Sequence, residues 1–230
     1  MGVFLYLCRV IDNIEQIRQL LNFEDKGDFY MLYVFKRKKD QPEGEKDNHQ
    51  SVRTIKSYCV TSVEYLERRY DEIKQLCEMF KARAYIHVQK QNHKDVSLNM
   101  MVALAQRIQD GNLYQQGLFD SVVGQIKTLE KRWIVDIDTK DDDYLLEVMN
   151  HINNHCGPFR NKREIHTHTS AGMVISYDRV PKVIKTIPTK NGFHFITEKF
   201  DVMEFKKRYP DIDIQKKNPT LLYLPNSLDS

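Results

Sequence analysis

Residues 132–143, RWIVDIDTKDDD, begin as a buried strand would, with tryptophan, isoleucine and valine in the first half. Asp136 and Asp138 then stand at alternate positions, where burying an unpaired charge is very unfavourable. Residues two apart in a strand share one face at a spacing of roughly 6.5 Å. The two carboxylates therefore either face water or hold a positively charged group.

Two interpretations of this pair of acids remain open. Carboxylates at this spacing can bind one or two divalent cations, an arrangement that neutralises phosphate charge and activates a hydroxyl in nucleotidyl transfer. Alternatively, the strand ends at Ile137, with Asp138 capping the turn into the next helix and Asp136 paired with a lysine. Short acidic pairs are frequent near strand ends. The three acids that follow, 141–143, are suited to the start of a helix.

The composition is that of an ordinary globular protein, with 230 residues, 41% of them hydrophobic, and a net charge of +3. This length allows one generous domain or two small ones. No stretch resembles a signal peptide or approaches the length of a membrane span, so we expect a cytoplasmic protein. A charge this small is compatible with a nucleic-acid partner but does not require one. The scattered cysteines argue against a disulfide framework and are expected to be reduced and mostly buried: Cys8, Cys59, Cys77 and Cys156.

Segments with strand and helix patterns alternate along the chain, and Ser62 is placed to cap one of the helices. The predicted strands are 3–11, 29–39, 54–62, 82–89, one within 132–143, 164–170, 172–178, 182–189, 192–200 and 220–225. The predicted helices are 14–21, 63–81, 96–108, a short one within 111–125, 141–156 and 202–209; 40–51 is expected to be an exposed loop. This order predicts an α/β (α+β) fold with a mixed sheet and flanking helices. We expect one domain over 1–230, with an N-terminal α/β part, 1–125, and a motif-bearing part, 126–230.

A second motif is TKNGFHFIT, residues 189–197. Asn191 and Gly192 suit a tight turn, and His194 follows on a strand. A histidine in this position can donate to a triphosphate oxygen, with help from Lys190 and the backbone amides of the turn. A histidine in a strand can equally be a plain structural residue.

A third motif is DIDIQKKNPTLLYLP, residues 211–225. Asp211 and Asp213 share one strand face in this prediction, and Lys216 and Lys217 follow closely. An acid followed by a basic cluster suits a pocket for a metal ion and a triphosphate. A surface turn with compensating charges uses the same residue types, so this motif is ambiguous by itself.

In their order, VDID, TKNGFH and DIDIQKKN resemble the three motifs of the archaeo-eukaryotic primase superfamily, which includes replicative primase small subunits and primase-polymerases. In that family a DxD or DxE on a core strand is followed by a small-residue turn leading to a histidine, and then by a further metal-binding acid. The resemblance covers roughly the C-terminal half of the chain. It implies an RRM-like catalytic sheet beside a smaller N-terminal α/β unit.

The resemblance also implies roles for individual residues. Three catalytic acids would hold Mg²⁺ or Mn²⁺ in a two-metal site: Asp136, Asp138 and Asp213. Asp211 could equally be the third acid, and Pro219 stands where the family often continues with arginines. His194 would contact the phosphates of the incoming nucleotide, and Lys216 or Lys217 would hold phosphate.

Two further groups of residues are candidates from their own positions. Arg83, on the strand predicted over 82–89, is a candidate phosphate or template contact, or else a surface arginine at a strand start. A zinc site can be imagined from nearby histidines and a cysteine, although the His151 and His155 pair can also be a solvated helix face. The residues of that imagined site are His151, His155, Cys156, His166 and His168.

The leading hypothesis is therefore a metal-dependent nucleotidyltransferase, of the DNA primase and polymerase type, that joins nucleotides on a template. Its partners would be a nucleic-acid template and nucleoside triphosphates, with a helicase or another replication protein as a further partner, and no membrane. Two alternatives are a non-catalytic protein that binds single-stranded nucleic acid and a metal-dependent nuclease.

Overall fold

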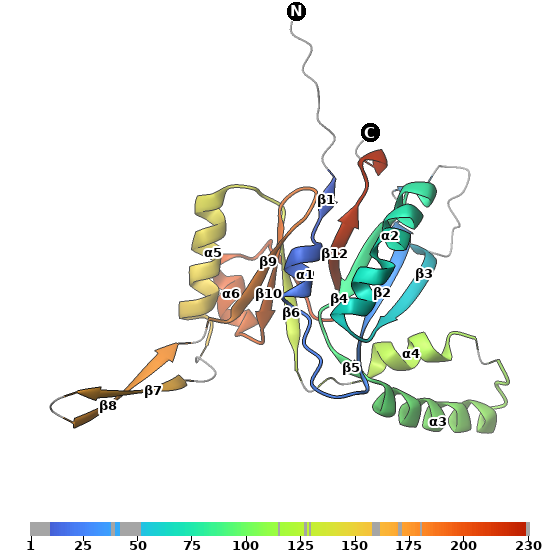
Figure 1. The fold of residues 1–230 in the computed structure, drawn as a ribbon, viewed down its shortest axis with the longest axis horizontal. Coiled ribbons are helices and arrows are strands. Elements are labelled where there is room, and N and C mark those ends of the chain that lie inside the picture. Colours follow the sequence, from blue (N-terminus) through green and yellow to red (C-terminus); the bar gives the residue numbers. More distant parts are fainter. Residues whose placement is uncertain are drawn as a thin grey trace, which may run out of the picture. The chain divides into compact units, whose positions relative to one another are not determined.

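A computed structural model describes residues 10–37, 40–41, 52–114, 116–126, 128, 130–157, 162–169, 172–179 and 181–228; for 162–169, 172–179 and Ser227 it describes the backbone alone. The chain forms two compact units (Figure 1). Unit 1 contains the chain up to Lys131 and again from Lys217, and unit 2 is Arg132–Lys216. The C-terminal strand returns to unit 1, and this N-terminal unit is the larger of the two rather than the smaller.

Unit 1 is built on one sheet in which the strands run in the order β1-β12-β4-β2-β3, with β5 paired to β2. Their bounds are β1 Ile11–Asp12, β2 Asp28–Arg37, β3 Val52–Val60, β4 Arg83–His87, β5 Gln91–Asn92 and β12 Pro219–Leu224. Asn13 fastens the C-terminal strand to this sheet, because its backbone N–H donates to the carbonyl of Leu222 and its side chain donates to that of Leu221, both over 2.9 Å.

Helices cover both faces of the unit 1 sheet. The bounds of the helices in this unit are α1 Ile14–Arg18, α2 Val63–Phe80, α3 His93–Gln109 and α4 Leu118–Gln125. The α2 helix begins as predicted, with the hydroxyl of Ser62 accepting the N–H of Tyr65 over 3.0 Å. It packs on the face that carries Leu32 and Tyr58. The α3 and α4 helices pack on Phe29 and Met31, which point to the opposite face.

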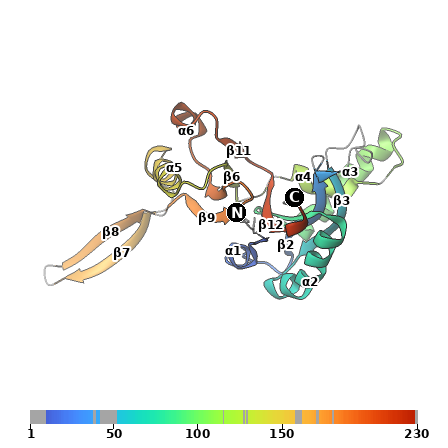
Figure 2. The ribbon, with the colours of Figure 1, turned by 90° about the horizontal axis from the view of Figure 1, so that it is seen from above.

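Unit 2 has the order strand, helix, strand, strand, helix, strand, with an additional hairpin inserted after the first helix. Its elements are β6 Arg132–Ile137, α5 Asp142–His155, β7 Lys162–Thr169, β8 Gly172–Arg179, β9 Val183–Pro188, β10 Phe193–Glu198, α6 Val202–Arg208 and β11 Asp213–Gln215. Figure 2 shows the inserted hairpin β7–β8 as a two-stranded ribbon. The four remaining strands are ordered β11-β6-β10-β9. This is the split βαβ arrangement of ferredoxin-like and RRM sheets.

The prediction that the sheet has mixed direction is wrong for the pairings that the structure describes, because all of them are antiparallel. The crossover through α5 makes β6 and β9 parallel to each other. However, β10 lies between them and runs the opposite way. Parallel strands are therefore never neighbours in this sheet.

The hydrophobic core of unit 2 fixes which way each strand residue points. Trp133, Val135 and Ile137 of β6 and Phe195 of β10 pack with residues of α5 and α6 on one face of the sheet. The alternate residues of the same strands, among them Ile134, Asp136 and His194, must point to the opposite face. The fold thus separates the residues that hold unit 2 together from the motif residues.

Several predictions can be compared with the described part of the chain. Three cysteines are free, with Cys77 and Cys156 buried and Cys59 half-buried. None of the helices in the described ranges is long and apolar enough to cross a membrane. Cys8, most of the strand predicted over 3–11 and the loop predicted over 40–51, apart from its first two residues, lie outside the described residues.

Candidate functional site

The three sequence motifs meet in the middle of the unit 2 sheet. Asp136 of β6 is the direct partner of His194 on one neighbouring strand, β10, and of Asp213 on the other, β11. Residues directly opposite in antiparallel strands project to the same face with their Cβ atoms about 5 Å apart. Asp136, His194 and Asp213 therefore form one row, which we call the acid row, on the face opposite α5 and α6.

Side-chain contacts connect this acid row. Nε2 of His194 lies 3.4 Å from Oδ1 of Asp136. The amide of Gln215 donates to Oδ2 of Asp136 over 3.3 Å and to Oδ2 of Asp213 over 3.0 Å. A single NH₂ group thus bridges the two carboxylates. His194 is buried, and Asp136 and Gln215 are half-buried.

Gln215 was not predicted from the sequence, although a weak signal for it exists. It stands two residues after Asp213, so any strand that places Asp213 on this face places Gln215 there too. Its contact with Asp136 depends on the pairing of β11 with β6, because the two residues are 79 positions apart in the sequence.

Asp138 lies outside the acid row. The β6 strand ends at Ile137, as the alternative interpretation held, and Asp138 is exposed beyond it. That alternative is wrong in two other respects. Asp141 rather than Asp138 caps α5, accepting the N–H of Asp143 over 3.1 Å and that of Tyr144 over 3.2 Å. Asp136 contacts His194 and Gln215, whereas the alternative expected it to pair with a lysine.

The two acids of the third motif do not share a strand face. Asp211 is exposed in the turn before β11, whose first residue is Asp213. Lys206 of α6 fastens this turn, since its ammonium donates to the carbonyls of Pro210 and Ile212, both over 2.7 Å. Of the two acids, Asp213 is therefore the one that the fold places beside Asp136.

The surroundings of Gly192 explain why this position of the second motif needs a residue without a side chain. A Cβ atom at this position would overlap the carbonyl oxygen of Ile137 and lie 2.6 Å from the backbone nitrogen and 2.8 Å from the backbone oxygen of Thr139. The hydroxyl of Thr189 also accepts the N–H of Gly192, over 3.1 Å. The turn before His194 is thus packed directly on the backbone that follows Asp136.

The predicted basic residues fall into both units. Lys190 is exposed on the turn before Gly192, and the ammonium of Lys216 lies over the ring of Trp133, 5.1 Å from its centre. Both belong to unit 2, with the acid row. Lys217 belongs to unit 1, where its ammonium donates to the carbonyl of Gly124 over 2.9 Å.

Arg83 also belongs to unit 1 and is used internally. Its guanidinium is 2.7 Å from the carboxylate of Asp40, and both side chains are almost fully buried. The expectation of a surface arginine at a strand start is therefore wrong. Arg83 is not part of the candidate site, because its charge is paired with Asp40 inside unit 1.

The acid row offers oxygen ligands that suit Mg²⁺ or Mn²⁺, but not a complete set of protein ligands. Over the described ranges, no group of three or more His, Cys, Asp or Glu side chains is arranged to hold a metal ion. Mg²⁺ commonly binds through one or two carboxylates together with water and substrate phosphates. Asp136 and Asp213 fit that pattern, with the bridging amide of Gln215 at the place where a cation would lie.

The imagined zinc site is not assembled among the side chains that the structure describes. His151 and His155 stack with ring centres 5.4 Å apart, and His151 is buried rather than solvated. Both ring nitrogens of His151 lack a hydrogen-bond partner. Burial, with Arg208 and His155 nearby, lowers the pKa of His151. The side chains of His166 and His168 lie outside the described residues.

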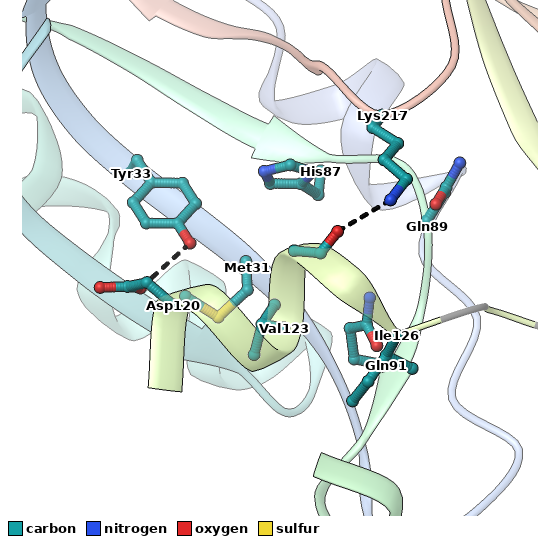
Figure 3. A pocket seen from close by; sticks show the side chains of 10 residues that line it. Met31, Tyr33, His87, Gln89, Gln91, Asp120, Val123, Ile126 and Lys217 are labelled. Carbon is teal, nitrogen blue, oxygen red and sulfur yellow. Dashed lines mark hydrogen bonds between the residues drawn. The ribbon is translucent and has the colours of Figure 1, made fainter. Parts of the chain in front are cut away.

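Unit 1 holds a separate small pocket of about 70 Å³ (Figure 3). In it the hydroxyl of Tyr33 donates to Asp120 over 3.4 Å, and burial together with Asp120 raises the pKa of Tyr33 to about 12. Burial lowers the pKa of His87 to about 4, so this ring is neutral near pH 7. Of the residues predicted to be functional, Lys217 lines this pocket.

The acid row is thus the place where the predicted motifs converge, and no sequence or structure neighbour adds to its interpretation. Comparisons with known proteins find no matching family model, no matching curated protein and no matching solved structure.

Proposed function

We propose that this chain is a metal-dependent nucleotidyltransferase of the primase-polymerase type, which joins nucleotides on a nucleic-acid template in the cytoplasm. One observation carries the proposal. Asp136, His194 and Asp213 come from three separate motifs, and they occupy one row of a sheet with the RRM strand order. The order of the motifs in the sequence provides independent support.

The residues of the acid row have complementary tasks in such a reaction. Asp136 and Asp213 would hold Mg²⁺ or Mn²⁺, and nucleotide phosphates and water would complete the coordination. The metal, when bound, neutralises phosphate charge and lowers the pKa of the attacking hydroxyl. His194, whose Nε2 lies 3.4 Å from Oδ1 of Asp136, would donate a hydrogen bond to a phosphate oxygen. Exposed Lys190, on the adjoining turn, adds positive charge near the triphosphate.

The chemistry of the sheet face favours an enzyme over a non-catalytic binding protein. RRM domains bind single strands by stacking bases on aromatic rings of the two central strands. On the corresponding face, β6 and β10 carry Ile134, Asp136, His194 and Ile196, while Phe195 points into the core. Among these four side chains, His194 has a ring on which a base could stack, but it is buried beside Asp136. Carboxylates and aliphatic side chains are poor stacking surfaces for bases, whereas carboxylates suit metal and phosphate chemistry.

A template-extension assay with Mn²⁺ and nucleoside triphosphates, with and without a primer, tests this proposal. Asp136→Asn and Asp213→Asn should each lower incorporation by about 100-fold or more, because a metal ligand contributes several kcal/mol to the transition state. Asp211→Asn is the matched control, since Asp211 is an exposed acid of the same motif outside the row. It should retain the activity of the unchanged protein.

The same assay separates the alternatives. Degradation of the template without extension would identify a nuclease. Binding of single strands with neither reaction, and with no effect of Asp136→Asn, would identify a non-catalytic binding protein. Full incorporation by both row variants would contradict the proposed site. A helicase or another replication protein that brings the template is the partner to look for once extension is measured.

A further inference from the structure

The side-chain amide of Gln215 lies between two carboxylates of the acid row. Its amide nitrogen is 3.3 Å from Oδ2 of Asp136 and 3.0 Å from Oδ2 of Asp213. The hydrogens of an amide NH₂ carry partial positive charge, and each can point to one carboxylate. The amide thereby offsets the repulsion between two like charges on neighbouring strands.

The position of Gln215 in the fold allows its side chain to leave without disturbing the sheet. It is the last residue of the three-residue strand β11, which lies at the edge of the sheet next to β6. Its backbone is fixed by the pairing with Ile134, but its side chain is only half-buried. Rotation about side-chain bonds is enough to remove the amide from between the carboxylates.

We propose that Gln215 is an internal competitor for the metal, which closes the acid row until a cation and a nucleotide displace it. This inference rests on the proposed function, and it assigns Gln215 the regulation of that site. Gln215 therefore acts through Asp136 and Asp213: its amide donates to both carboxylates and thereby lowers the affinity of the row for a cation. The triphosphate, by adding ligands to the metal, makes displacement favourable.

Mn²⁺ binding to the full chain without nucleotide, followed by electron paramagnetic resonance, measures this competition directly. Gln215→Met keeps the side-chain length and removes the amide, and Gln215→Ala removes most of the side chain. Both variants should bind Mn²⁺ roughly tenfold more tightly, because hydrogen bonds from the amide to two charged groups no longer oppose binding. Gln75→Ala, at an exposed glutamine of α2, should leave the Mn²⁺ affinity unchanged.

Unchanged or weaker Mn²⁺ binding in both Gln215 variants, with thermal unfolding like that of the unchanged protein, would overturn the inference. Weaker binding would instead mean that the amide oxygen of Gln215 is a metal ligand. Asp136→Asn combined with Gln215→Met separates this failure from that of the proposed function. If the double variant still binds Mn²⁺ tightly, the acid row is not the metal site. If it loses binding while Gln215→Met alone changes nothing, only the competition is refuted.

Discussion

On the face of the unit 2 sheet that α5 and α6 cover, some buried polar atoms lack a hydrogen-bond partner, whereas the polar side chains of the acid row on the opposite face contact one another. Two polar side chains of the covered side, His151 and Thr197, have buried atoms without a hydrogen-bond partner. Asp136 and Asp213, in contrast, share the amide of Gln215. On the covered face, close packing leaves some polar atoms without hydrogen bonds. On the opposite face, two carboxylates lie close together around one amide.

This difference leads to separate expectations for the two sides. Substitutions on the covered side should alter the free energy of unfolding, because the residues there are buried or provide hydrogen bonds to the end of a helix. Changes in the acid row should alter metal binding and activity with little effect on stability. The turn at Gly192 adjoins the row and also packs on backbone, so it should affect both.

The largest stability effect is expected at Lys182, on the covered side. This lysine is 3% exposed, and its ammonium donates to the carbonyls of Ile152, Cys156 and Gly157 at the end of α5. Lys182→Met leaves these carbonyls without that donor. We expect the free energy of unfolding to fall by about 3 kcal/mol, measured by urea denaturation.

An exposed lysine near the same sheet provides the control. Lys199→Met should change the stability by less than about 0.5 kcal/mol, because this side chain is exposed. Equal stability of the two variants would show that the carbonyls at the end of α5 do not depend on Lys182.

The next largest effect is expected at Gly192. Alanine here must displace the backbone around Ile137 and Thr139, and such overpacking typically costs about 2 kcal/mol. Gly192→Ala should also weaken Mn²⁺ binding, because the turn moves away from Asp136. Gly124→Ala is the control, since a Cβ at that helical position meets nothing within 4 Å and should be neutral or slightly stabilising. Equal melting temperatures for the two alanine variants would contradict the packing role of Gly192.

The elements that local sequence patterns predict well are those with local causes. The α2 helix was predicted within one residue of its observed ends, because the hydroxyl of Ser62 caps it and its apolar residues recur on one face. The alternation in β6 likewise separates a core face from a motif face without any knowledge of neighbouring strands.

Features that depend on distant pairing could not be predicted in this way. The contact of Gln215 with Asp136 requires β11 to lie beside β6, and the burial of Arg83 requires Asp40, 43 residues away. Asp211 fell outside β11 because the turn held by Lys206 extends to Ile212. These contacts are set by strand order and by turn geometry, which hydrophobic periodicity does not encode.

A smaller effect, dependent on pH, is expected at His151. Burial, with Arg208 and His155, lowers its pKa in the fold, while Glu204 and Glu147 act in the opposite direction. The unfolded chain binds a proton near pH 6.5 and the folded chain only at lower pH, so stability falls as the pH drops below about 6.5. His151→Phe should remove this part of the acid sensitivity and raise the stability by about 1 kcal/mol near pH 6. An identical pH dependence of unfolding in the variant would show that His151 does not contribute.

The smallest stability effect is expected in the acid row itself, at Asp213. Its side chain is exposed on an edge strand, so Asp213→Asn should change the free energy of unfolding by less than about 0.5 kcal/mol. The same change should lower the Mn²⁺ affinity by about tenfold or more, because one of the two carboxylate ligands is lost. Denaturant unfolding and Mn²⁺ titration of one preparation measure both quantities. A variant that unfolds much more easily but binds Mn²⁺ normally would reverse the assignment of the two faces, since Asp213 would then support the fold rather than the metal.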